Sequence, residues 1–122
     1  VYNIRDVVQA GTSGRVDLAE DSSCQVFQDH FTYAAKTHFG RDNYMRYGGS
    51  PVFFLYTLRD YTNHENCIKI ALEQVKLNYG HTPYIIGDSI WWYPSPEKYD
   101  WASMQAINVS AVTAYNLYDG GQ

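Results

Sequence analysis

The sequence predicts an α/β fold with parallel strands and flanking helices, arranged as part of a (β/α) barrel. Two apolar runs, at residues 51–58 and 83–87, are each bounded by turn residues, as strands covered on both faces are. A helical pattern lies between them, which gives a strand–helix–strand unit with a crossover long enough for parallel pairing. Carboxylates and aromatic residues follow each run, where ligands meet parallel sheets.

The composition indicates one domain and argues against two classes of partner. The chain has 122 residues, of which 45% are hydrophobic and 18% charged, so it can bury a core. Its net charge of −4 and the lack of a basic cluster argue against nucleic acid. No apolar run is long enough to span a membrane. Aromatic residues make up 16% of the chain, which fits either a Tyr-rich core or an aromatic binding surface.

Residues 1–21 form an irregular lead-in to the first expected helix. That helix begins at Ser22, because Ser22-x-x-Gln25 fits a capping box, and it ends at Gly40. Its apolar residues recur at helical spacing and are expected to face a core. They are Phe27, Phe31, Ala34, Ala35 and Phe39. His30 and His38 on the same helix are expected to face solvent, and residues 41–50 are expected to form a loop with a tight turn at Gly48-Gly49.

The second expected helix has a capping box at Thr62-x-x-Glu65 and ends at Gly80. Its apolar positions predict a broad buried stripe. They are Ile68, Leu72, Val75 and Tyr79, widened by Cys67, Ile70, Ala71 and Leu77. Cys24 and Cys67 each fall in an expected helix, without the spacing of a metal site. We expect buried free thiols, with a disulfide as the alternative.

An aromatic loop at residues 90–99 follows the second strand, and a short third helix follows it through Trp101 and Met104. A third strand is expected at residues 109–114. The tripeptide Asn108-Val109-Ser110 matches a glycosylation acceptor. Because it lies at the start of that strand, we expect it to be buried.

Two carboxylates stand just after neighbouring strand ends, at Asp60 and Asp88. Adjacent parallel strands lie about 4.8 Å apart, so the two carboxylates could approach each other as glycoside hydrolysis requires. The alternative is that Asp60 pairs with Arg59 or a neighbouring cation and that Asp88 caps a loop. The histidines lack metal-ligand spacing, so the sequence predicts no metal site.

Aromatic and amide residues supply the remaining candidate binding groups. Trp91 and Trp92 offer large rigid faces for stacking, and the alternative is that they cover the end of a barrel or a partner surface. Tyr115 and Asn116 follow the third strand, where alternation turns one of them toward the cleft. Their alternative is packing before a turn at Gly120. Together these groups favour a glycan or oligosaccharide as ligand.

Residues 43–56 read Asn-Tyr-Met-Arg-Tyr-Gly-Gly-Ser-Pro-Val-Phe-Phe-Leu-Tyr. This segment resembles one in the family 99-like glycoside hydrolases, where a helix ends in a phrase of the type Asn-Tyr-x-x-x-x-Gly-x-Pro-Val and a strand follows. Residues 83–88 and 114–116 are similar to later parts of the same fold. The resemblance covers residues 25–119 and implies the central segment of a (β/α)8 barrel, a hydrolase that cleaves glycosidic bonds without a cofactor.

Two departures from that family limit the expected activity. A complete barrel has about 250 residues, so the chain is expected to be a piece of something longer or a processed product. The Glu-x-x-Glu type motif of the family's catalytic pair is absent. We therefore assign no catalytic residue and expect this chain alone to be inactive. The candidate residues are expected to bind substrate in the cleft. They are Asp60, Asp88, Trp91, Trp92, Tyr115 and Asn116. The compartment stays open, with a slight preference for an extracellular or cell-surface location.

The alternative is a non-catalytic carbohydrate-binding or self-assembling structural module. A short series of parallel strands leaves edges that must be shielded. The shield would be a second copy of the chain or the remainder of a barrel.

Overall fold

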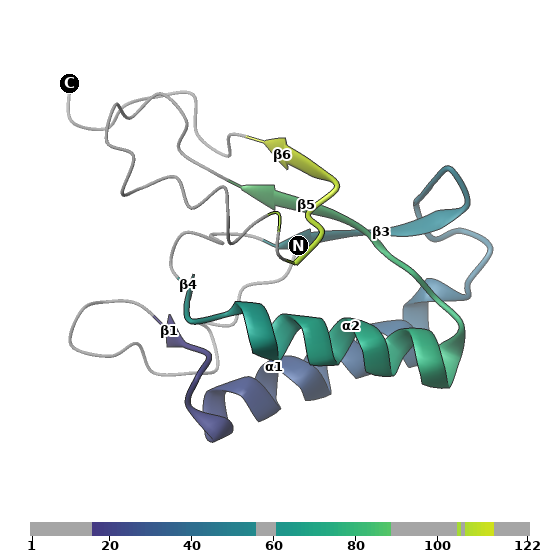
Figure 1. Cartoon of the computed structure of the whole chain (residues 1–122). Helices are drawn as coiled ribbons and strands as arrows, with labels where there is room; N and C mark the ends of the chain where they lie inside the picture. Colours follow the sequence, from purple (N-terminus) through teal and green to yellow (C-terminus); the bar gives the residue numbers. More distant parts are fainter. Residues whose placement is uncertain (1–15, 56–60, 89–104, 106, 114–122) are drawn as a thin grey trace.

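The computed structural model describes residues 16–55, 61–88, 105 and 107–113, which form a mixed α/β structure (Figure 1). Two helices pack against a sheet of mainly parallel strands. In chain order the elements are β1 (Val16–Asp17), α1 (Asp21–Ala34), the π-helical turn η2 (Ala35–Phe39), β2 (Arg46–Tyr47), β3 (Ser50–Leu55), β4 (Tyr61–Thr62), α2 (Glu65–Tyr79), β5 (Tyr84–Asp88) and β6 (Ala111–Thr113).

The main sheet has the strand order β2–β3–β5–β6, and β3, β5 and β6 are parallel. Phe53 pairs with Ile85, and Gly87 pairs with Val112. A separate parallel ladder joins β1 to β4. The predicted strand–helix–strand unit is therefore confirmed as β3–α2–β5. Within the described ranges the strands form an open sheet and one short ladder, with no closed ring of strands.

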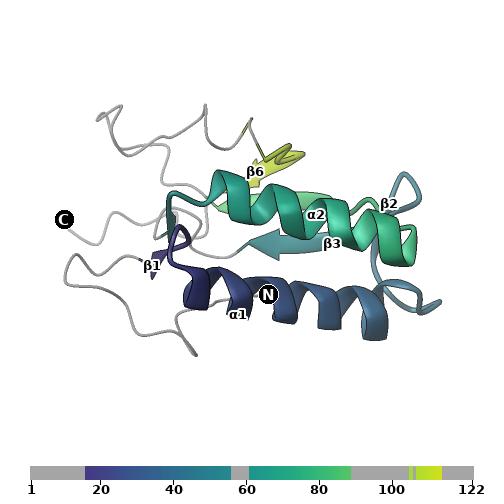
Figure 2. The ribbon, with the colours of Figure 1, turned by 60° about the horizontal axis from the view of Figure 1, so that its bottom comes forward.

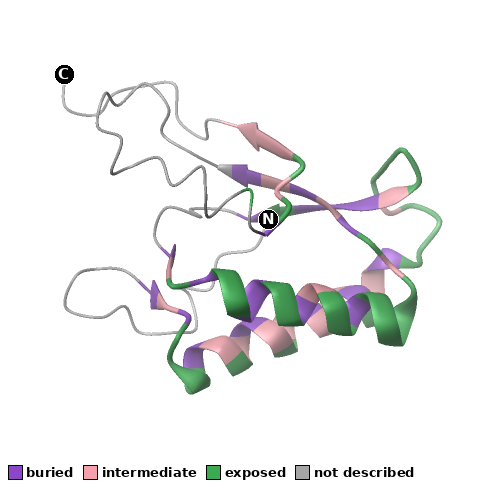
Figure 3. Ribbon diagram, in the orientation of Figure 1, coloured by how far each residue is buried: buried purple, intermediate pink, exposed green. Residues whose placement is uncertain are grey.

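Both helices lie side by side against one face of the main sheet (Figures 1 and 2). Their buried residues form stripes that face the strands, and their outer surfaces are exposed (Figure 3). Along β3, Phe53 and Leu55 are buried, whereas Phe54 between them is 37% exposed. This alternation follows from the two-residue period of a strand, with odd positions turned toward the helices.

The predicted aromatic stripe of α1 is confirmed, although the helix ends differ from prediction. Phe27, Phe31, Ala35 and Phe39 are each at most 2% exposed. Residues four apart drift by about 40° per step around an α-helix. The wider η2 turn opposes this drift, which keeps Phe39 on the core side. The predicted cap at Ser22 is wrong, because α1 begins at Asp21 without a side-chain capping bond.

Helix α2 ends as predicted but begins later and buries a narrower stripe. Gly80 adopts a left-handed conformation with φ of 71°, which suits a helix terminus. The predicted cap at Thr62 is wrong, because Thr62 belongs to β4 and the helix begins at Glu65. The predicted burial of Ile70, Leu77 and Tyr79 is also wrong, because all three are exposed. Ile70 and Leu77 each lie two residues, or about 200°, beyond a buried residue of the core stripe, and Tyr79 is the last residue of the helix.

The segment expected as a loop at residues 41–50 contains a short hairpin. β2 pairs antiparallel with the start of β3, and the connecting residues Gly48 and Gly49 have φ of 57° and 83°. Two positive φ values match the tight turn that suits a two-residue hairpin, and glycine adopts them without strain. The predicted tight turn is confirmed. The Arg46 guanidinium donates hydrogen bonds to the carbonyls of Phe39 and Gly49, which joins the hairpin to the end of η2.

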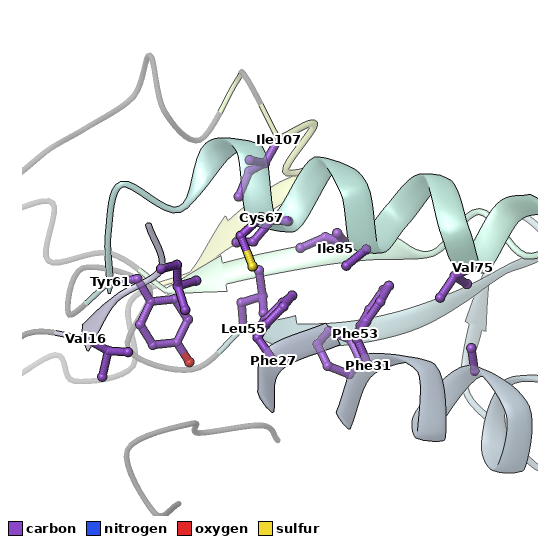
Figure 4. Close-up of a cluster of buried hydrophobic side chains, with 14 of the residues drawn as sticks. Val16, Phe27, Phe31, Phe53, Leu55, Tyr61, Cys67, Val75, Ile85 and Ile107 are labelled. Carbon is purple, nitrogen blue, oxygen red and sulfur yellow. The ribbon is translucent and has the colours of Figure 1, made fainter. Parts of the chain in front are cut away.

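The hydrophobic core lies between the helices and the sheet (Figure 4). Phe31 lies within it, with its ring centroid 4.9 Å from that of Phe53, 5.9 Å from that of Phe39 and 6.0 Å from that of Phe27. The contacts with Phe53 and Phe39 are edge-to-face, the geometry that aromatic quadrupoles favour. One aromatic cluster thus holds α1, η2 and β3 together.

Cys24 and Cys67 form a disulfide between α1 and α2, with Cα atoms 5.7 Å apart. The expectation of two free thiols is therefore wrong, and the alternative holds. The two helices are neighbours along their lengths, so the cysteines on their facing flanks come within bonding distance. Spacing in the sequence did not reveal this contact, because the partners lie 43 residues apart.

Breaking this disulfide should lower the free energy of unfolding by about 2–4 kcal/mol, because the bond restricts the unfolded chain. Denaturant unfolding with and without a reductant measures the effect. The Cys24→Ala/Cys67→Ala variant is the control, since its unfolding midpoint should not respond to the reductant. An unfolding midpoint of the native chain that is equally insensitive would contradict the pairing.

Candidate functional site

The carboxyl ends of the parallel strands meet at one edge of the sheet. β3, β5 and β6 end at Leu55, Asp88 and Thr113. Leu55 pairs with Gly87, and Asp88 pairs with Thr113, so the three strands end within about one residue of each other. Their arrowheads point to the same side of the molecule in Figure 1. In open α/β sheets this edge is where ligands bind.

Of the six predicted site residues, Asp88 is the one that lies on a described element. It is the last residue of β5 and therefore stands at the carboxyl edge, as predicted. The other five follow the described strands and lie outside the described residues. They are Asp60, Trp91, Trp92, Tyr115 and Asn116. The structure thus fixes the strand ends from which these segments depart, and their mutual arrangement stays a prediction.

A second carboxylate, at Asp17, lies in the β1–β4 ladder on the same side of the molecule as these strand ends (Figures 1 and 2). Its Oδ1 accepts hydrogen bonds from the Ala19 amide at 2.9 Å and from Asn63 Nδ2 at 3.1 Å. These bonds join the turn before α1 to the turn before α2. Asp17 therefore has a structural role, and the sequence alone did not indicate its hydrogen-bond partners.

His64 is the N-cap residue of α2. Its side chain is 5% exposed, which is unusual for a histidine. Asn63 before it has φ of 50°, a left-handed conformation that asparagine tolerates better than most residues. Together these two residues turn the chain sharply from β4 into α2.

A groove of about 480 Å³ runs between α1 and β3, and sequence reasoning missed it. His30, Ala34 and His38 recur every four residues along its helical wall, and Tyr44, Val52 and Phe54 contribute to the remainder. The expectation that both histidines face solvent is wrong, because they are half-buried and line this groove. The signal in the sequence that could have revealed the groove was the four-residue spacing of His30, Ala34 and His38, beside the buried stripe that contains Phe31.

Tyr44 connects the groove to the edge of β3. Its hydroxyl donates a hydrogen bond of 2.6 Å to the Val52 carbonyl, and its ring lies 5.4 Å from that of Phe39. Burial raises the pKa of the Tyr44 phenol above its usual value, because burial disfavours the charged phenolate. The fold therefore stabilises the protonated Tyr44 phenol, which is the form that donates this hydrogen bond.

Replacing Tyr44 with Phe should lower the free energy of unfolding at pH 7 by about 1 kcal/mol, the net value of a hydrogen bond. Because the folded pKa is raised, this contribution is present below about pH 10 and is lost as pH rises through the folded pKa. Denaturant unfolding between pH 7 and 11 should show the native and variant stabilities converging.

The matched control is Tyr47→Phe, since Tyr47 is 65% exposed. It should change the free energy of unfolding little at either pH. Equal stability of the native chain and the Tyr44→Phe variant at pH 7 would contradict the role of this hydrogen bond.

The described residues offer no metal centre. No group of three or more His, Cys, Asp or Glu side chains within them is arranged to hold a metal ion. Among the same residues, neither helix has the length and apolar character needed to cross a membrane. Comparison with protein families, with curated proteins and with solved structures found no match to this chain.

Proposed function

We propose that this chain is a segment of a carbohydrate-active (β/α) barrel that binds a glycan at the carboxyl edge of its sheet. The observation that carries the proposal is the parallel register of β3, β5 and β6, whose ends meet at that edge. All six candidate residues stand at or within five positions after these ends. The segments that carry these residues therefore all start from the carboxyl edge of the sheet, which we call the binding mouth.

Within the described part of the chain, no helix packs on the second face of the sheet, and this supports a barrel in particular. The helices cover the face that carries Phe53 and Ile85, whereas Phe54 and its partner Ile86 point to the opposite face. Phe54 is 37% exposed, and Ile86 is half-buried. In a barrel, inward-facing side chains of this kind pack against those of the other strands. Further strands would bury this face.

The candidate residues suit recognition of a sugar. The indoles of Trp91 and Trp92 present apolar faces that can stack on the C–H surfaces of a pyranose ring. The carboxylates of Asp60 and Asp88 can accept hydrogen bonds from sugar hydroxyls, as ionised acceptors do strongly. Tyr115 and Asn116 add further hydrogen-bonding groups. These roles are orienting and stacking, while the acid and base for hydrolysis would come from elsewhere in the barrel.

A second candidate function is a non-catalytic, self-associating carbohydrate-binding module. The outer edge of β3 favours it, because β2 pairs only with the first residues of that strand. Beyond that hairpin, the described residues place no strand on the side of Phe53–Leu55 that faces away from β5, and the groove along α1 opens there. A second copy could pair with such an edge.

Tryptophan fluorescence can test glycan binding, because the third indole, Trp101, can be removed so that Trp91 and Trp92 alone give the emission. In the Trp101→Phe variant, a bound oligosaccharide should shift or quench the emission of Trp91 and Trp92. The Trp91→Ala/Trp92→Ala variant should lose this response. Asp88→Asn should weaken binding roughly tenfold, which is about 1.4 kcal/mol at 25 °C.

A folded chain that binds nothing on a glycan array would contradict both candidate functions. Glycan binding by a stable dimer would favour the second candidate over the first. Hydrolysis of aryl glycosides by this chain alone would contradict the view that the acid and base lie elsewhere.

A further inference from the structure

We propose that Asn108 is an acceptor of an N-linked glycan. Asn108-Val109-Ser110 is the one Asn-x-Ser/Thr tripeptide among the seven asparagines of the sequence. Such a glycan is bulky and hydrophilic, so the fold must hold its acceptor at the surface. The surroundings of Asn108 meet this requirement.

The tripeptide is exposed, so the expectation of a buried site is wrong. Asn108 and Ser110 are both exposed, and Val109 between them packs against the core. The Asn108 amide donates a hydrogen bond of 3.0 Å to the Gln105 carbonyl, and Asn108 has φ of 54°. The tripeptide lies in this turn before β6 begins, and its two polar residues are exposed whereas the valine is half-buried.

The tripeptide lies at the edge of the sheet opposite the proposed binding mouth. The Ser110 amide donates a hydrogen bond of 2.8 Å to the Ile85 carbonyl, near the amino end of β5. The candidate residues instead follow the carboxyl ends of β5 and β6. A glycan on Asn108 would therefore extend away from that mouth, and its presence does not depend on the function proposed above.

Asn108 lines a groove of about 210 Å³, which offers a surface that the first sugar can contact. Leu72, Pro83 and Ile85 supply apolar contacts, and Glu73 and Lys76 supply polar groups at the same groove. A hexose ring has both C–H faces and hydroxyls, so this mixed lining suits it. The glycan would cover apolar surface between α2 and β5.

The Cys24–Cys67 disulfide is an independent observation that points to the same modification. Disulfides form and persist in oxidising compartments such as the lumen of the secretory pathway. N-glycosyl transfer takes place in that lumen from a lipid-linked oligosaccharide diphosphate. Asn108 Nδ2 bonds to the anomeric carbon and loses a proton, while the bond from that carbon to the diphosphate oxygen breaks. The lipid diphosphate leaves with the electron pair.

The test is expression of the chain with a cleavable secretory signal in eukaryotic cells, followed by mass spectrometry of cells and medium together. We expect a glycan that peptide-N-glycosidase removes, leaving Asp at position 108. Ser110→Ala should reduce occupancy to background, and Ser110→Thr should retain it. Asn78→Gln, which alters an exposed asparagine outside any acceptor tripeptide, should leave the glycan in place.

A non-reducing peptide map of the glycosylated chain should show Cys24 joined to Cys67, which establishes that the folded surface accommodates the glycan. A chain that carries the disulfide and no glycan would overturn the proposal. A glycan that persists in Ser110→Ala, or that occurs only on chains without the disulfide, would also overturn it.

Discussion

The parallel pairing of β3 with β5 is the constraint on which the other features depend. Two parallel strands cannot be joined by a tight turn, so the chain must travel back along the sheet between them. Helix α2 makes this return, and its buried residues attach it to the sheet face that also receives α1. Because parallel strands all start at one edge of the sheet, β3, β5 and β6 all end at the opposite edge. The candidate binding mouth is a consequence of this directionality.

The two helices are held in place by different means. Helix α1 is attached by aromatic packing, in which Phe31 contacts Phe53 across the layer boundary. Helix α2 is attached by small and branched side chains and by the disulfide to Cys24. Since both helices occupy one face of the sheet, the residues that point the other way, such as Phe54, have few partners among the described elements. This asymmetry is what suggests further strands or a second copy.

Features set by local periodicity and terminators could be predicted from the sequence. The strands around Phe53 and Ile85, the Phe31 stripe and the end of α2 at Gly80 are of this kind. Features that depend on contacts between distant segments could not. The disulfide requires the two helices to be neighbours, and Thr62 is removed from its predicted capping role by pairing with Asp17 in β1. In the candidate site, the position of Asp88 followed from its strand, whereas the groove beside α1 required knowledge of how that helix lies along β3.

The central claim is that β3, β5 and β6 run in the same direction, and backbone nuclear Overhauser effects in an isotope-labelled sample test it most directly. We predict contacts between β3 and β5, and between β5 and β6, in which residue numbers on both strands increase together. The Phe53–Ile85 and Gly87–Val112 pairs should be among them. Contacts in which the numbers on one strand rise as those on the other fall would show antiparallel pairing, and they would contradict both the fold and the shared edge.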